Sequence, residues 1–466
     1  MSDLAALSAR GLAKAIRERK VSSVEVTTAA IARLKDADAL THCIVALEAE
    51  EALAEAQAAD AAIAAGRAGG ALLGVPVAHK DMFDRKGRIA SWGAKIRADR
   101  PAAADATAIA RLKHAGALQI AALHLAKFAY GPTGHNYVLG HARNPWDPTR
   151  ITGGSSAGTA AAVAYGAIAA GLGSDTGGSL RVPAACCGIT AIKPTWGRIS
   201  RAGAMPLSPQ LDTIGVLARH VEDLALTLSL LAGPDARDPA AAPLPVPDYV
   251  ARLDEPIAGV AFGIDERLVA QAHPGVQRMV ESAAAILQEL GLVRRSCRFA
   301  DWDTLDHLVQ LVQLPDAAAV HAAFLRTRPN DYGPQVRARA EGGHFIAAVD
   351  HVTALRARGT YLQRALEATF REVEIALLPV LADEVPTIAE LDISGGPQVQ
   401  AVMGRVVKFT RPINYLGLPA LSLPIPRAGG LPNGVQLIGR PFAEARLMAI
   451  GQGYQRLVPP EIARPR

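Results

Sequence analysis

The sequence predicts a layered α/β fold, in which helices alternate along the chain with short buried strands. Segment 107–114 has the pattern of a helix closed by Gly116, and the apolar run 118–123 that follows has the length and composition of a buried strand. Half of the 466 residues are hydrophobic and 20% are charged, which excludes a disordered or fibrous chain. This length fits either two or three average domains or one large α/β domain.

The N-terminal third is expected to open with helices before the chain enters the sheet. Ser22 and Glu25 have the spacing of a capping box ahead of apolar residues at helical intervals. An alanine-rich helix is expected over 46–65, and the apolar run 72–78 indicates a buried strand. Lys80 is therefore expected at the end of that strand.

The rest of the chain continues the alternation. Segment 157–173 is rich in Ala and Gly; it predicts a tightly packed interior helix and is too short and too weakly apolar to span a membrane. Strand-like runs at 375–380, 419–425 and 434–438 would complete the sheet. We expect one domain made of N-terminal helices (1–65), a core with the glycine-rich motifs (66–232), a Pro/Ala-rich connector with a mostly helical insertion (233–374) and a C-terminal part that completes the sheet (375–466).

Charge and cysteine content indicate no metal and no nucleic-acid surface. The net charge is +5, but the basic residues are scattered, and the densest early cluster includes Glu18, which favours a solvated helix face. The cysteines lack metal-ligand spacing, so we expect them to be reduced and buried. Charges interrupt the apolar residues of the N-terminus, which predicts a cytoplasmic protein without a secretory signal. The basic cluster is Arg10, Arg17, Arg19 and Lys20, and the cysteines are Cys43, Cys186, Cys187 and Cys297.

Two Gly-Gly-Ser turns flank a run of small residues between 152 and 188. Glycine permits backbone conformations that aim consecutive N–H groups at one point, as an oxyanion hole requires. In this interpretation Thr176, Gly177 and Gly178 form the hole and Ser179 is the nucleophile. An ordinary glycine-rich turn with a capping serine is the alternative.

Other interpretations of the glycine motifs fit less well. Residues 171–176 begin like the dinucleotide motif G-x-G-x-x-G but end in Thr, and no lysine follows as in a phosphate-binding loop. Residues 154–158 match G-x-S-x-G, but the segment before them, 144–152, contains two prolines and five polar or charged residues instead of an apolar strand. Nucleotide binding and an α/β-hydrolase are therefore disfavoured.

A serine nucleophile needs a base, and nothing in the sequence places His135 or His141 beside Ser179. A lysine can serve if burial lowers its pKa from about 10.4 toward neutrality. Lys80, directly after an apolar strand, is the best-placed candidate. An ordinary surface lysine is the alternative for this residue.

Several motifs, in order, resemble the amidase signature family: GVPVAHKD at 74–81, GGSS at 153–156 and GSDTGGSLRVPA at 173–184. The resemblance continues through 193–195, 211–215, 419–424 and 434–439, and so covers nearly the whole chain. It implies one α/β/α domain around a mixed sheet and an amidohydrolase that cleaves a C–N bond without a cofactor or metal.

The resemblance also implies the roles of three residues. Ser179 matches the nucleophile, Lys80 the base, and Ser155, which follows a cis peptide bond from Gly154, the proton relay. The acyl group would be carried on Ser179 and released by water. Asp175 and Arg181 are further family positions, for which an ion pair or turn clamp is expected.

The chain departs from the family beside these residues. Where many relatives read G-K-T-N-x-x-E-F, segment 121–128 reads AALHLAKF, and segment 157–159 reads AGT in place of Gly-Gly-Ser. The loop that follows residue 128, with Tyr130 and His135, is expected to line the acyl pocket.

Two functions are compatible with these observations. The first is a stand-alone amidase that acts on a small-molecule amide and water, with esters, anilides and carbamates as further substrates. In this case we expect neither nucleic acid nor a membrane as a partner, and a homodimer is one option. The second is the glutaminase-type A subunit of a tRNA-dependent amidotransferase. The first is favoured because Leu123, His124 and Lys127 stand where the usual family motif has Thr, Asn and Glu. The charged α-amino and α-carboxylate groups of glutamine need specific partners once they are desolvated, and the altered motif is better suited to a less polar acyl group. A non-catalytic scaffold is disfavoured because every triad position is filled.

Overall fold

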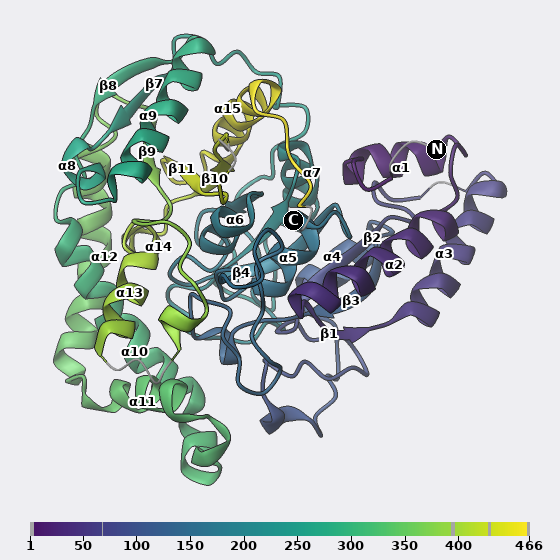
Figure 1. Ribbon diagram of the computed structural model, residues 1–466, viewed down its shortest axis with the longest axis horizontal. Helices are drawn as coiled ribbons and strands as arrows, with labels where there is room; N and C mark the ends of the chain where they lie inside the picture. The colour runs from purple at the N-terminus through teal and green to yellow at the C-terminus, as the bar shows by residue number, and fades with distance from the viewer. Residues whose placement is uncertain (1–3, 68, 393–396, 427–429, 464–466) are drawn as a thin grey trace.

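The computed structural model describes residues 4–67, 69–392, 397–426 and 430–463, and its centre is one mixed sheet flanked by helices (Figure 1). The described strands form an eleven-stranded sheet in the order β1-β3-β2-β4-β6-β5-β10-β11-β9-β7-β8, which confirms the predicted fold class. The strands are β1 (Ile44–Leu47), β2 (Pro76–Lys80), β3 (Leu118–Leu123), β4 (Ala170–Asp175), β5 (Thr190–Lys193), β6 (Thr213–Ala218), β7 (Ala261–Ile264), β8 (Val293–Ser296), β9 (Ile375–Pro379), β10 (Ala420–Pro424) and β11 (Gly434–Gly439).

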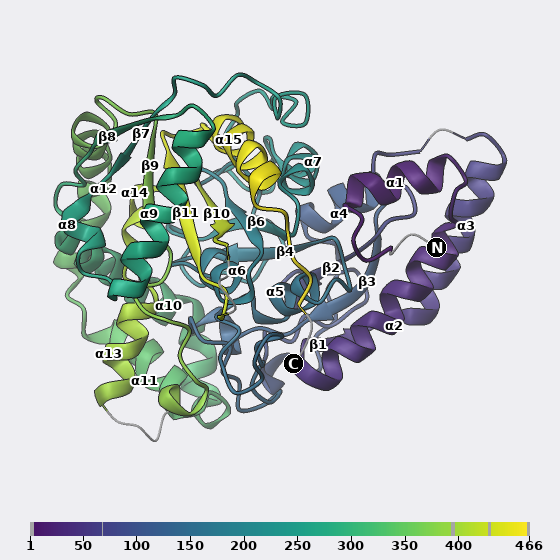
Figure 2. The same ribbon diagram turned by 45° about the horizontal axis from the view of Figure 1, so that its top comes forward.

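Helices cover the sheet and lie at both of its ends. Figures 1 and 2 show α1, α2 and α3 together at the end that holds β1, and α10, α11, α12 and α13 gathered on the other side of the molecule. The α-helices are α1 (Ala9–Arg17), α2 (Ser23–Thr41), α3 (Ala49–Ala64), α4 (Thr107–His114), α5 (Ala157–Ala164), α6 (Arg181–Cys187), α7 (Val221–Leu231), α8 (Glu266–Val269), α9 (Pro274–Glu289), α10 (Trp302–Thr327), α11 (Pro334–Gly342), α12 (Ala348–Ala368), α13 (Pro397–Val406), α14 (Arg411–Leu416) and α15 (Glu444–Leu457). Short 3-10 helices are Lys95–Arg97, Lys127–Ala129, Pro329–Asp331, Gly343–Phe345 and Ala389–Leu391.

Residues of the central strands alternate between two hydrophobic cores. In β6, Ile214 and Val216 belong to one buried cluster with residues of α7 and α15, whereas Leu217 belongs to another with residues of α5 and α6. Successive side chains of a strand point to opposite faces, so helices cover both faces of the sheet. The sheet is mixed because β2 pairs in parallel with β3 and β4, whereas β4 pairs antiparallel with β6.

Most predicted elements are confirmed, including the capping box of Ser22 and Glu25 and the strand that ends at Lys80. The expected helix over 46–65 begins later, at Ala49, because the four-residue strand β1 precedes it and pairs with β3. The insertion 233–374 also supplies β7 and β8 at the edge of the sheet.

The predicted helix over 157–173 is wrong in its second half, because α5 ends at Ala164 and β4 begins at Ala170. Gly166 has φ +75°, a left-handed conformation that ends the helix and that glycine adopts without strain. The small residues of β4 allow α5 to pack closely on the sheet. A Cβ atom on Gly171 would lie only 2.6 Å from Thr159 Cγ2 of α5, which is closer than side-chain atoms can approach. The run of small residues thus reflects close packing of α5 on β4.

Among the described helices, α10 alone is long and apolar enough to cross a membrane by length and composition. It packs against α11, α12 and α14 in this structure. Its apolar side chains Leu305, Val309 and Val312 are buried in the core that also contains the sheet residues Ile375 and Leu377. The apolar character of α10 is therefore used in packing within the fold.

Candidate active site

Lys80 is the last residue of β2 and is fully buried. Its Nζ atom donates hydrogen bonds to Ser155 Oγ at 2.7 Å and to Ser174 Oγ at 2.9 Å. Burial lowers the pKa of Lys80 to about 7, although the carboxylates of Asp212 and Asp175 act in the opposite direction. A large fraction of this amine is neutral near pH 7, so it can accept a proton.

Ser155 lies in the first glycine-rich turn and accepts the hydrogen bond from Lys80. The Gly154–Ser155 peptide bond is cis, and the Ser155 side chain is buried. The N–H of Ser156 donates to the carbonyl oxygen of Ser179 at 3.3 Å, which ties the first turn to the second. No residue in the described ranges forms a hydrogen bond with Ser179 Oγ, so the Ser155 and Ser179 hydroxyls lie in adjoining turns without a direct bond.

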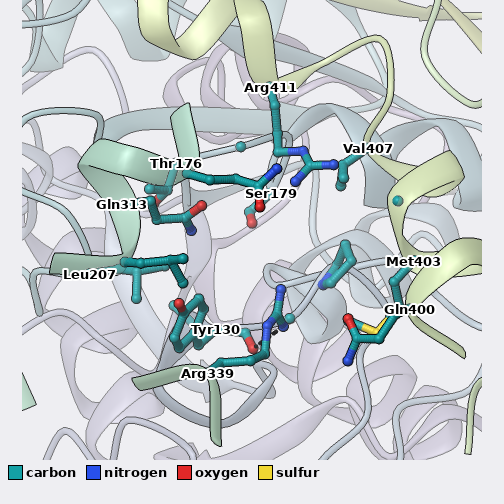
Figure 3. Close-up of a pocket in the computed structure, with 17 residues that line it drawn as sticks. Tyr130, Thr176, Ser179, Leu207, Gln313, Arg339, Gln400, Met403, Val407 and Arg411 are labelled. Carbon is teal, nitrogen blue, oxygen red and sulfur yellow. Dashed lines mark hydrogen bonds between the residues drawn. The ribbon is translucent and has the colours of Figure 1, made fainter. Parts of the chain in front are cut away.

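Ser179 lies in the turn between β4 and α6 and lines a cavity of about 400 Å³, together with Thr176 and Gly177 (Figure 3). Within the described parts of the chain, the N–H groups of Gly177 and Ser179 have no acceptor, so both are available to a substrate oxygen. The N–H of Gly178 instead donates to Asp175 Oδ1 at 2.7 Å. Of the residues predicted to form an oxyanion hole, Gly178 therefore has its N–H group occupied within the turn.

The glycine-rich turn that contains Ser179 is held by a buried ion pair, in agreement with the clamp expected for Asp175 and Arg181. Arg181 Nη2 lies 3.0 Å from Asp175 Oδ1, and both side chains are fully buried. Burial alone would raise the pKa of Asp175, but Arg181 lowers it to well below its ordinary value. Asp175 also accepts hydrogen bonds from the N–H of Leu180 and from Asn414 Nδ2, and Arg181 donates to Gln436 Oε1.

The structure separates the two residues predicted to line the pocket. Tyr130 lines the cavity that contains Ser179. His135 lines a different cavity, and its ring nitrogens contact Thr133 Oγ1 at 2.9 Å and the Ile388 carbonyl oxygen at 3.1 Å. His135 is therefore not among the residues that line the Ser179 cavity; Gly134, which has φ +83°, lies next to it in the loop that also contains Tyr130.

Several residues of the site were not singled out from the sequence. Ser174 contacts Lys80, and its place at the end of β4 inside the GSDTGGS motif is a signal that could have identified it. Asp212 accepts a 2.6 Å hydrogen bond from Thr176 Oγ1 and so fixes a residue of the cavity. Arg339 of α11 and Arg411 of α14 also line the cavity. Both lie far from Ser179 in the sequence, and no motif around them predicts that they reach the cavity.

The cysteines are all free, and three of them are buried; Cys297 is partly exposed. Among the described residues there is no group of three or more His, Cys, Asp or Glu side chains that could hold a metal ion.

A serine in a glycine-rich turn beside a buried lysine–serine pair is typical of serine hydrolases that use lysine as the base. Comparison with known proteins gives the family directly: the Amidase family profile matches residues 25–448. The chain therefore belongs to the amidase family, and it is an enzyme that hydrolyses C–N bonds, as predicted.

Its relatives include the A subunit of the glutamyl-tRNA(Gln) amidotransferase of Chloroflexus aurantiacus, which is 35% identical over 100% of this chain and 99% of that protein. Among solved structures, an s-triazine catabolic enzyme described with a vestigial protein complex is 31% identical, with a TM-score of 0.90 over 98% of this chain and 100% of that one. The A subunit of the Thermotoga maritima amidotransferase is 27% identical, with a TM-score of 0.82 over 100% and 99% of the two chains.

These relatives contradict one expectation from the sequence. We expected a small-molecule amide and water as partners, no nucleic acid or membrane, and a homodimer as one option. The curated relatives are subunits of an enzyme whose name specifies Glu-tRNA(Gln). The replaced residues at 123–127, on which that expectation relied, are not among the residues that line the Ser179 cavity, so they do not argue against glutamine as its ligand.

Proposed function

We propose that the chain cleaves a carboxamide through an acyl-enzyme on Ser179, with Ser155 as relay and Lys80 as base. The observation that carries the proposal is the buried Lys80 amine, 2.7 Å from Ser155 Oγ and with its pKa lowered to about 7 by burial. Ser155 lies in the turn that contacts the Ser179 turn, and Ser179 opens onto a cavity large enough for a small acyl group.

The proposed reaction begins with neutral Lys80. As Ser179 Oγ attacks the carbonyl carbon, its proton passes to Ser155 and the Ser155 proton passes to Lys80 Nζ. The N–H groups of Gly177 and Ser179 stabilise the oxyanion. The C–N bond then breaks as the proton returns through Ser155 to the leaving nitrogen. Water attacks the resulting ester by the same proton path and releases the acid.

The relatives favour a particular setting for this chemistry. We propose that the chain is the amidohydrolase component of a larger assembly, by analogy with the amidotransferase relatives, and that it works in the cytoplasm. In such an assembly the amide supplies nitrogen, released as ammonia, to a reaction carried out by partner chains. The similarity to the amidotransferase relatives over the full length of the chain supports this setting.

The test of both proposals is a matched pair of proteins, wild type and Ser179→Ala, each purified alone and with the chains that co-purify with it. We expect amide hydrolysis to fall by at least about 10³-fold in Ser179→Ala, because only binding and oxyanion stabilisation remain. Ammonia release is measured from an amide panel that includes glutamine. Hydrolysis at the wild-type rate by Ser179→Ala would overturn the catalytic assignment, and a chain purified without partners at full activity would overturn the assembly.

A further inference from the structure

A second cavity, of about 340 Å³, lies at the N-terminus of α11, the helix labelled near the bottom of Figure 1. It is the cavity that His135 lines, and it shares no lining residue with the Ser179 cavity. Lys95 and Lys127 also line it, and Asp331 is the only acidic residue among its described lining. A molecule bound there would therefore meet mainly positive charge and would not contact the proposed nucleophile.

Lys127 lines this second cavity with an ammonium group that has no counter-ion. The residue is 7% exposed, and its Nζ atom donates one hydrogen bond, to the carbonyl oxygen of Asp331. None of the described carboxylates lies within 4 Å of Nζ, because the Asp331 carboxylate pairs with Arg328 at 2.6 Å. Burial lowers the pKa of Lys127, although Asp331 acts in the opposite direction. A buried ammonium that uses one of its three N–H donors is suited to an anionic ligand.

The backbone of α11 offers further donors to the same cavity. The helix begins at Pro334, and its N-cap residue Gly333 supplies no side-chain cap. Within the described part of the chain, the N–H groups of Gln335 and Val336 have no acceptor, and both residues line the cavity. Free N–H groups and the helix dipole attract negative charge to a helix N-terminus. The uncapped start of α11 and the buried Lys127 therefore favour the same kind of ligand, although they belong to segments far apart in the sequence.

We propose that Lys127, Lys95 and the N-terminus of α11 bind a phosphate group, either free or carried by a small organic molecule. Ammonium groups act as point charges and the N–H donors come from successive residues, which is typical of phosphate sites. No arginine, whose planar fork matches a carboxylate, is among the described residues of the lining. A volume of about 340 Å³ also leaves room for an organic group beside the phosphate.

The site is expected to be a property of this chain and not of the whole family. Lys127 stands at the position where many relatives have Glu in the motif G-K-T-N-x-x-E-F. A carboxylate at this position would repel a phosphate that the lysine attracts. The inference concerns a second ligand, so it does not depend on the reaction proposed for Ser179.

The first test measures binding to the wild-type chain by calorimetry at constant ionic strength. The probes are glycerol phosphate, inorganic phosphate, acetate as a planar anion, and glycerol. We expect both phosphates to bind at least about 10-fold more tightly than acetate, as for charge-assisted hydrogen bonds from two lysines, and glycerol not to bind. Tighter binding of glycerol phosphate identifies an organic phosphate as the ligand, and equal or tighter binding of inorganic phosphate identifies the free anion. Acetate binding as tightly as the phosphates, or no binding of either phosphate, would overturn the inference.

The second test assigns the binding to residues. Lys127→Gln and Lys95→Gln should each weaken phosphate binding about 10-fold or more. Lys95 is exposed, so its substitution tests the site even if the loss of the buried Lys127 disturbs the fold. Lys86→Gln is the matched control, because Lys86 is an exposed lysine that does not line the cavity, and it should keep the wild-type affinity. Unchanged affinity in both cavity variants would refute the site. Binding of a short RNA that depends on Lys127, without binding of either phosphate probe, would assign the cavity to nucleic acid and overturn the inference as well.

Discussion

The chain contains two fully buried lysines, Lys80 and Lys193, whose amines have different hydrogen-bond partners. Burial lowers the pKa of Lys80 and of Lys193 to about 7 in each case. Lys80 contacts two serine hydroxyls, whereas Lys193 donates to the carbonyl oxygen of Pro194. The two lysines thus have similarly lowered pKa values, but only Lys80 has a hydroxyl group beside its amine from which it can accept a proton.

This difference predicts the pH dependence of activity. Lys80 must be neutral to accept a proton, so kcat/KM should rise as the pH is raised through about 7. Lys80→Met should lower kcat/KM by about 10³-fold or more and leave a residual rate without this rise. Initial rates between pH 5 and 9 provide the measurement, with Lys193→Met as the control that keeps the wild-type profile. A wild-type rate that is flat through pH 7 would require another base.

At the scale of elements, the glycine-rich turn that contains Ser179 depends on contacts between segments that are distant in sequence. The clamp of Asp175 and Arg181 joins the end of β4 and the start of α6 to Asn414 of α14 and Gln436 of β11. The turn is therefore positioned by four elements. Its geometry is a property of the folded sheet and cannot be formed by the local glycine motif alone.

The clamp gives a stability prediction. Asp175→Asn leaves the buried Arg181 charge without its counter-ion, so we expect the free energy of unfolding to fall by about 3–5 kcal/mol. Asp147→Asn is the control, because Asp147 and Arg150 form a half-exposed pair 3.7 Å apart whose loss should cost about 1 kcal/mol or less. Urea unfolding followed by circular dichroism measures both. Equal losses of unfolding free energy in the two variants would show that the buried Asp175–Arg181 pair contributes no more to stability than the half-exposed pair.

How far the sequence predicts these elements depends on the kind of signal. The strand ending at Lys80 and the helix capped by Ser22 were predicted because apolar runs and capping residues are local patterns. The small-residue run 157–173 misled because small residues permit close packing as well as helix formation. Arg339 could not be predicted to line the cavity, since it lies in α11, 209 residues after Tyr130, and reaches the cavity only in the folded chain.

At the scale of the whole molecule, burying Lys80, the base of the proposed reaction, reduces the free energy of unfolding. Between pH 7 and about 10.5 the unfolded chain keeps a proton on Lys80 that the folded chain has lost. The stability of the wild type therefore falls as the pH is lowered from about 10.5 to 7, and this group causes no further loss below that range.

Replacing the lysine with an apolar side chain should reverse this loss. Lys80→Met and Lys193→Met should each be more stable than the wild type at pH 7, by a few kcal/mol at most, and the gain should shrink toward pH 10. Guanidinium chloride unfolding at pH 7, 8.5 and 10 measures the difference. A gain that does not change with pH would mean that protonation is not its cause.

The contacts of Arg181 also have a consequence for the order of events during synthesis. Asn414 and Gln436 lie 233 and 255 residues after Arg181, so they leave the ribosome long after the nucleophile does. Until then Ser179 is present in the nascent chain, but the turn that would orient it lacks half of its supports. The enzyme is therefore expected to remain inactive until its last β-hairpin has folded onto the sheet, and a fragment ending before residue 414 should contain the whole triad and hydrolyse nothing.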